Sequence, residues 1–151
     1  MQDRKKRGFI LIELIVVLLL ITIIMGIVTV FFANFLPSSK FDATVRTIAS
    51  TIKHARALSK INNETKIITI DIDSRRFGIE GIGSKDIPQG IGIKIIDPYY
   101  GEIVHGKYRF IVYNTGNIDA GDIILWNSSK SSTIRIDPII GAVVIKQNEK
   151  S

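Results

Sequence analysis

Cysteine is absent from this 151-residue chain, and histidine occurs only twice, at His54 and His105. Without cysteine the chain forms no disulfide bonds, and thiol nucleophiles and structural zinc sites are excluded. The two histidines fall in separate segments, one on the polar side of a helical pattern and one in a loop-like stretch. No group of residues has the pattern of a catalytic centre. The sequence therefore predicts a protein with no enzymatic activity, no cofactor and no bound metal.

Charge is nearly absent between Phe9 and Phe35, where Glu13 is the only charged residue. A helix of about 27 residues is roughly 40 Å long, more than the ~30 Å hydrocarbon core of a bilayer requires. A basic cluster precedes this run and comprises Arg4, Lys5, Lys6 and Arg7. Because no basic residue follows the run directly, the N-terminus is expected in the cytoplasm and the rest of the chain outside.

A cleaved secretory signal is the alternative interpretation of this segment. Such a signal has an apolar region of only ~7–15 residues and ends in small residues of the Ala-x-Ala kind. Here the apolar run is longer, and Ala33-Asn34-Phe35 does not fit such a site. The sequence therefore favours a retained single-pass membrane helix.

Glu13 needs an explanation, because a carboxylate inside a membrane-length helix costs roughly 2.5 kcal/mol or more. We interpret Gly8–Phe9 as a cleavage site, at which glycine leaves room for a protease. The amine freed at Phe9 would be cationic, since its reference pKa is about 8. Glu13 could neutralise such an amine on a neighbouring subunit, and the low dielectric would strengthen the pair. In the alternative, Glu13 reaches the cytoplasmic interface and interacts with the helix N-terminus.

The segment from Lys6 to Glu13 (Lys-Arg-Gly-Phe-Ile-Leu-Ile-Glu) resembles the processing site of type IV prepilins and type II secretion pseudopilins. The resemblance implies that prepilin peptidase cuts after Gly8 and that the new terminal amine of Phe9 is methylated. It also implies assembly with other pilins or pseudopilins into a helical filament, extracted from the inner membrane. Many major pilins have proline where this chain has Val30, whereas here Pro37 lies at the end of the run.

Net charge is +6 for the whole chain, yet Asp3 to Arg7 holds four positive charges and one negative. A chain without residues 1–8 therefore has a net charge of +3. Much of the basic character belongs to the leader and is weak evidence for nucleic-acid binding.

Helical periodicity resumes after Pro37-Ser38-Ser39, which interrupts the apolar pattern. One mostly apolar stripe comprises Phe41, Val45, Ile48, Ile52, Ala55 and Ser59. The opposite face carries Arg46, Lys53 and Lys60, with Arg56 beside them. This basic face is either solvated or a contact surface for acidic neighbours in a filament or for polyanions.

Short alternating strands separated by turns are expected after the helix. The candidates are Ile68–Ile72, Arg76–Ile79, Ile91–Ile96, Lys107–Tyr113, Asp122–Trp126, Thr133–Asp137 and Ala142–Lys146, with turns that include Asp73–Arg75 and Asn127–Ser132. The glycine-rich stretch 78–92 is expected to be a mobile loop, because it lacks the lysine that a phosphate loop requires after its second glycine. The fold class is α+β, with a long N-terminal membrane helix continuing as an amphipathic helix packed on antiparallel sheets.

Four segments are expected: a leader over 1–8, a membrane and filament-core helix over 9–36, the amphipathic half of the helix over 37–63, and an extracytoplasmic β-rich domain over 64–151. Trp126 is expected in the core, whereas Tyr99-Tyr100 fit either the core or a contact surface. Asp119 and Asp122 flank a glycine turn, and solvation is favoured for them over cation binding because the spacing of a calcium loop is missing.

The region after the membrane helix resembles the H-type minor pseudopilins (GspH/FimT group). The resemblance is carried by the helix end from His54 to Asn63, by the strand and glycine turn from Phe110 to Gly116 followed by Asp122–Leu125, and by Gly141-Ala142-Val143. It implies a minor subunit at or near the tip of a type II secretion pseudopilus that contacts secreted cargo. The alternative is a minor pilin of a type IV pilus or DNA-uptake filament.

DNA binding is disfavoured, because residues after Gly141 are apolar where the DNA-binding relatives have arginines. Only scattered cations remain in this part of the chain: Lys130, Arg135, Lys146 and Lys150. If they bound phosphate, the affinity would fall steeply with salt.

Replacing Gly8 with a bulky residue such as leucine is expected to block removal of the leader, because the side chain obstructs the peptidase. Immunoblots of membrane fractions would show only the uncleaved chain. Normal cleavage of the variant would contradict the assignment of the site.

Overall fold

The computed structural model describes the backbone of residues 3–138 and 142–149, and the side chains of 11–29, 38–138 and 142–148. Two compact units make up the chain, one ending at Pro37 and one beginning at Ser38. Each unit is described on its own. Phe9, which is the expected site of N-methylation, the basic leader cluster, Val30 and Gly141 lie outside the described side chains.

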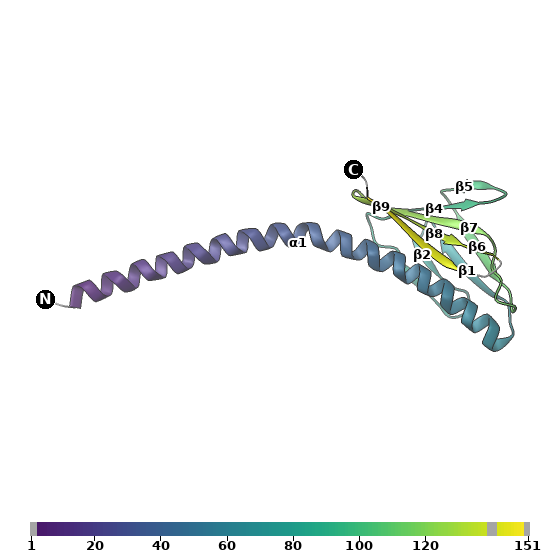
Figure 1. Ribbon diagram of the computed structural model, residues 1–151, viewed down its shortest axis with the longest axis horizontal. Coiled ribbons are helices and arrows are strands. Elements are labelled where there is room, and N and C mark those ends of the chain that lie inside the picture. Colours follow the sequence, from purple (N-terminus) through teal and green to yellow (C-terminus); the bar gives the residue numbers. More distant parts are fainter. Residues whose placement is uncertain (1–2, 139–141, 150–151) are drawn as a thin grey trace. The chain divides into compact units, whose positions relative to one another are not determined.

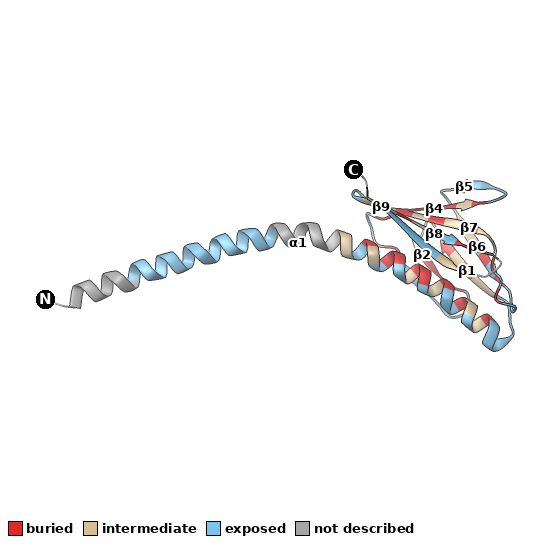
Figure 2. Cartoon of the chain, viewed as in Figure 1, coloured by how far each residue is buried: buried red, intermediate tan, exposed pale blue. Residues whose placement is uncertain are grey.

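The first unit is the N-terminal part of helix α1 (Asp3–Asn62). Within it, Leu11–Thr29 is a stretch of 19 residues with a mean hydropathy of 3.1, long and apolar enough to cross a membrane. All of its side chains are exposed, which Figure 2 shows in pale blue. The Thr22 and Thr29 hydroxyls donate to the Leu19 and Met25 carbonyls, at 2.8 and 2.7 Å, so both are satisfied inside the helix. The helix thus presents an apolar surface with no unpaired hydroxyl in this stretch.

Pro37 does not end α1. The proline interrupts the hydrophobic pattern, as expected, but the helix continues through it to Asn62. A proline inside a helix removes one backbone hydrogen bond, a cost that a long helix tolerates. The helix ends where Asn63 adopts a left-handed conformation (φ 52°) and Glu64 N donates to Ser59 O at 3.1 Å. This is the Schellman type of helix end, in which asparagine is accepted in place of glycine.

The described residues of the second unit include nine strands that follow α1. They are β1 (Lys66–Asp71), β2 (Arg76–Ile79), β3 (Gly83–Asp86), β4 (Gly92–Asp97), β5 (Gly101–Ile103), β6 (Lys107–Val112), β7 (Gly121–Trp126), β8 (Lys130–Ile136) and β9 (Val143–Glu149). They form a four-stranded sheet of order β3-β2-β1-β6 and a five-stranded sheet of order β5-β4-β7-β8-β9 (Figure 1). Every neighbouring pair is antiparallel. The predicted α+β class with antiparallel sheets is confirmed.

The stripe predicted on the helix is the face that packs on the sheets. Phe41, Ile52, Ala55 and Ser59 are fully buried, and Val45 and Ile48 are 1% exposed. Figure 2 shows red and pale blue alternating along this part of α1. The stripe joins inward-facing residues of both sheets in one hydrophobic core, including Ile70 of β1 and Ile123 of β7. Because each buried isoleucine contributes about 1.5–3 kcal/mol, this core holds the unit together without disulfides.

Two strands were not expected from the sequence. The stretch 78–92, predicted as a mobile loop, contains the end of β2 and all of β3, so that prediction is wrong. The register of the β2–β3 pair runs from Arg76↔Asp86 to Ile79↔Gly83. Strand β5 was also missed, and β8 begins at Lys130 inside the turn expected over Asn127–Ser132. These segments are short or polar edge strands and turn-flanking residues, which carry little alternating apolar pattern.

Asp97 connects the two sheets. Its Oδ1 accepts hydrogen bonds from the Tyr99 and Tyr100 amides at 2.7 and 2.8 Å, which fixes the turn between β4 and β5. Its other oxygen accepts a hydrogen bond from the Tyr108 hydroxyl on β6, in the other sheet. The Tyr108 hydroxyl is the main cause that lowers the pKa of Asp97, and the two amides add to it. The Tyr108 ring in turn packs edge-on against Phe110 at 4.7 Å.

Tyr108→Phe is expected to destabilise the second unit by about 1–2 kcal/mol at neutral pH, because it removes a hydrogen bond to a charged group. The lowered pKa of Asp97 means that its ionised form stabilises the fold above the ordinary aspartate pKa. That contribution disappears as the pH falls through the folded pKa. The difference between variant and wild type should therefore shrink in acid. Urea unfolding of residues 38–151 at neutral and acidic pH measures both quantities.

Tyr113→Phe is the matched control, because the exposed Tyr113 hydroxyl, directly after β6, makes a long contact of 3.4 Å with Asp119 Oδ1. An equal loss in the two variants would contradict the role given to Asp97.

Candidate functional site

The expected processing segment lies on the backbone of α1. Gly8 and Phe9 are helical residues of α1, and the side chains of Phe9 and of the basic cluster before it lie outside the described ones. Glu13 lies within the membrane-length stretch Leu11–Thr29 and is exposed. No ion pair joins Glu13 to another described side chain. Among the described side chains, Glu13 therefore has no charged partner.

The basic face expected on α1 divides into two parts. Arg46 and Lys53 are exposed, as predicted for a solvated or contact face. Arg56 is half-buried instead, and its Nε donates to the Gly116 carbonyl at 2.7 Å. The methylene stem of Lys60 also lies over Gly116, because a Cβ there would come within 2.0 Å of Lys60 Cε. Arg56 and the stem of Lys60 therefore hold the end of α1 to the rest of the unit.

The turn that receives them is built around Gly116. Its φ is +87°, a left-handed conformation that favours glycine. Gly116 N donates to Tyr113 O at 2.8 Å, and Tyr113 N donates to Asn117 O at 2.9 Å. Asn114 Nδ2 reaches Asn63 Oδ1, at 3.1 Å, beyond the end of the helix. The sequence predicted the turn, but not its contact with a helix 60 residues earlier.

Asp119 and Asp122 do not face a common site. Asp119 Oδ2 accepts the Ile111 amide at 2.9 Å. Asp122 lies on β7 and forms a two-oxygen pair with Arg135 on β8, at 2.9–3.1 Å, which raises the pKa of that guanidinium. Both carboxylates have protein partners and are half-buried, whereas the sequence favoured solvated turn residues. Within the described residues, no group of three or more His, Asp or Glu side chains is arranged to hold a metal.

The aromatic residues are more exposed than expected. Tyr99 and Tyr100 are 91% and 83% exposed, which excludes a core position for both. Trp126 is half-buried and lies over Gly92, with Lys94 Nζ 6.0 Å from its ring centroid, so its predicted core position is wrong. The two histidines are exposed, as predicted, and His105 Nδ1 is 3.6 Å from Asp73 Oδ1.

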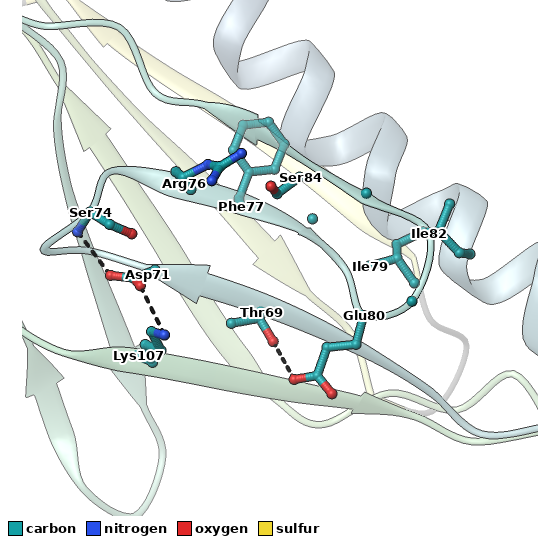
Figure 3. Close-up of a pocket in the computed structure, with 13 residues that line it drawn as sticks. Thr69, Asp71, Ser74, Arg76, Phe77, Ile79, Glu80, Ile82, Ser84 and Lys107 are labelled. Carbon is teal, nitrogen blue, oxygen red and sulfur yellow. Dashed lines mark hydrogen bonds and ion pairs between the residues drawn. The ribbon is translucent and has the colours of Figure 1, made fainter.

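A shallow hollow of about 620 Å³ lies on the outer side of the β3-β2-β1-β6 sheet (Figure 3). Gly78 lines this hollow and lets β3 approach β2 closely, because a Cβ there would be 2.0 Å from the Gly83 carbonyl oxygen. The charged groups that line the hollow have partners. Thr69 Oγ1 donates to Glu80 at 2.7 Å, which together with Arg109 lowers the pKa of Glu80, and Lys107 is 3.4 Å from Asp71. Arg76, the remaining charged group, is 3.2 Å from Asp86.

Comparison with protein families concerns the N-terminal segment. The model of the prokaryotic N-terminal methylation motif matches residues 3–29, which include Gly8, Phe9 and Glu13. A search of curated proteins finds no match to the chain. A methylation motif on a membrane-length helix that continues into an α+β unit defines a pilin-like chain.

Comparison with solved structures concerns the fold. The chain is similar to the minor pseudopilin EpsH from the type 2 secretion system of Vibrio cholerae, with a TM-score of 0.56 and 9% sequence identity. The alignment covers 71% of this chain and 96% of that one. At this identity the likeness establishes a shared pilin-like fold.

Arg56→Ala is expected to lower the free energy of unfolding of residues 38–151 by about 1–2 kcal/mol, because it removes a charged hydrogen bond to a carbonyl. Lys53→Ala, three residues earlier on an exposed position, should change it by less than about 0.5 kcal/mol. Urea unfolding of both variants measures the difference. Equal small effects would mean that Arg56 does not hold the helix end.

Proposed function

We propose that this chain is a minor structural subunit of a type II secretion pseudopilus. The observation that carries the proposal is the combination of the methylation motif over residues 3–29 with a fold similar to that of a minor pseudopilin. Both features belong to proteins that act by assembling. The role is mechanical, and it uses no catalytic residue and no cofactor.

Processing of the N-terminus is the first step of this function. Prepilin peptidase removes residues 1–8 by cutting after Gly8, and the amine of Phe9 is methylated. The basic cluster at residues 4–7 holds the leader at the cytoplasmic side of the inner membrane, and the C-terminal unit lies outside the cytoplasm. The secondary amine formed by methylation stays cationic near neutral pH.

Assembly is the second step and depends on Glu13. The helix Leu11–Thr29 exposes apolar side chains that are stable in lipid and unstable in water. It leaves the membrane only when other helices of the filament cover it. Glu13 pairs with the methylated amine of a neighbouring subunit, which removes an unpaired carboxylate from an apolar environment and sets the axial register. Contacts repeated head to tail that do not close into a ring generate a helical filament.

We also propose that the chain belongs to the H-type group and lies at or near the tip of the pseudopilus. There it contacts secreted proteins as cargo. Nucleic acid is not proposed as a partner, because two of the cations considered for it are already paired. Lys130 lies 3.3 Å from Asp42, and Arg135 is bound to Asp122.

The experiment that tests the proposal is the extracellular protein profile of a strain that lacks this gene, with and without complementation. Loss of specific secreted proteins, restored by complementation, is the expected result. An unchanged profile would contradict the secretion role and favour a type IV pilus or DNA-uptake filament.

Glu13→Ala is expected to leave cleavage after Gly8 intact and to reduce the amount of the chain recovered in sheared filaments, because the amine of a neighbour loses its counter-charge. Immunoblots of membrane and filament fractions measure the two steps separately. Leu14→Ala is the control, since it shortens an exposed apolar side chain next to Glu13 without changing charge. Full recovery of the Glu13 variant in filaments would refute the pairing.

A further inference from the structure

The solvent-facing side of α1 in the second unit carries positive charge and almost no negative charge. Arg46, Lys53 and Lys60 recur every seven residues, which places them on one line with a rise of about 10.5 Å between neighbours. All three residues are exposed, and so is Lys40 at the start of this part of the helix. We call Arg46, Lys53 and Lys60 the basic line of α1.

No carboxylate of the described residues neutralises the basic line. Asp42 is the only acidic residue of α1 after Glu13. It is held by Lys130 at 3.3 Å and accepts a hydrogen bond from Gln147 at 3.2 Å. Most other carboxylates of the unit also have partners; for example, Glu80 forms an ion pair with Arg109, and Asp86 forms one with Arg76. The charge on this side of α1 is therefore available to a partner.

Small side chains lie beside the basic line. Ala43, Ser50 and Ala57 are exposed, and they also recur every seven residues, three positions away from the cations. Helices with small residues at the contact approach more closely than helices with long ones. The seven-residue repeat is the one that lets two helices stay in contact along their length. The face thus combines room for a helix backbone with a parallel line of cations.

We infer that this face of α1 docks an acidic helix of a different pilin-like subunit, with carboxylates spaced about seven residues apart opposite Arg46 and Lys53. The inference rests on the proposed function, which places such helices side by side in a filament. A second copy of this chain is a poor partner for the face, because its own α1 would bring cations against cations. Duplex DNA would use the positive charge but has no need of the adjacent small residues.

The first test is charge reversal in the full-length chain, expressed in the deletion strain. Arg46→Glu combined with Lys53→Glu should lower recovery in sheared filaments at least about tenfold, since two attractive pairs become repulsive. Cleavage after Gly8 and thermal unfolding of the second unit should not change, because both side chains are exposed. Lys85→Glu combined with Lys146→Glu is the control, with the same change in net charge on β3 and β9. Its recovery should match that of the wild type.

The outcomes separate the inference from the proposed function. If the Arg46/Lys53 variant is recovered in filaments at the wild-type level, or if the control variant shows an equal loss, the inferred docking face is wrong. The chain would still be a filament subunit in either case. Absence of the wild-type chain itself from filaments, or no effect of deletion on secretion, would remove the proposed function.

The second test identifies the partner by photo-crosslinking from position 50, with a benzophenone amino acid in place of Ser50 in living cells. The expected adduct joins this chain to a different pilin-like subunit through a peptide that contains Asp or Glu residues seven positions apart. The same probe in place of Ser128, in the exposed turn before β8, is the control and should not give this adduct. An adduct with a second copy of this chain, with DNA, or with no pilin-like protein would contradict the inference.

Discussion

An apolar helix surface needs a cover wherever it lies, and this constraint applies to the part of α1 in each unit. The side chains of Leu11–Thr29 are all exposed in the isolated chain, and such an apolar surface is stable in contact with lipid or with other helices. A single carboxylate, Glu13, interrupts this surface near its N-terminal end. A buried charge needs a partner, and the proposed partner is the methylated amine that processing creates on a neighbour. In the proposed function, membrane anchoring and assembly use the same helix in two environments.

The unit from Ser38 onward has one hydrophobic core and no disulfides. One face of α1 packs with both sheets in a single hydrophobic cluster. Polar contacts over long sequence distances complete it, namely Arg56 to Gly116 at the end of the helix and Asp97 to Tyr108 between the sheets. Because these contacts occupy the inner sides of the elements, the outer side of α1 keeps its small and basic residues free for another molecule.

Sequence patterns predicted the parts of the fold that depend on periodic burial. The helix stripe beginning at Phe41 and the alternating isoleucines of β1 were found because burial repeats with the period of the element. Strand β3 (Gly83–Asp86) was missed because a fully exposed edge strand needs no apolar residues. The role of Arg56 was missed for another reason: its acceptor lies 60 residues away, and spacing within a helix carries no information about such a contact. The expected processing segment could be recognised from the sequence, because the residues that it needs are consecutive. The methylation motif covers the same residues.

The central claim is that processing makes this chain competent to assemble. Its most direct test is mass spectrometry of the N-terminal peptide of the chain purified from membranes and sheared filaments. The expected peptide begins at Phe9 and carries one methyl group on its amine, in both fractions. A chain that begins at Met1 in filaments, or one cut after residue 35 and released as a soluble protein, would contradict the account.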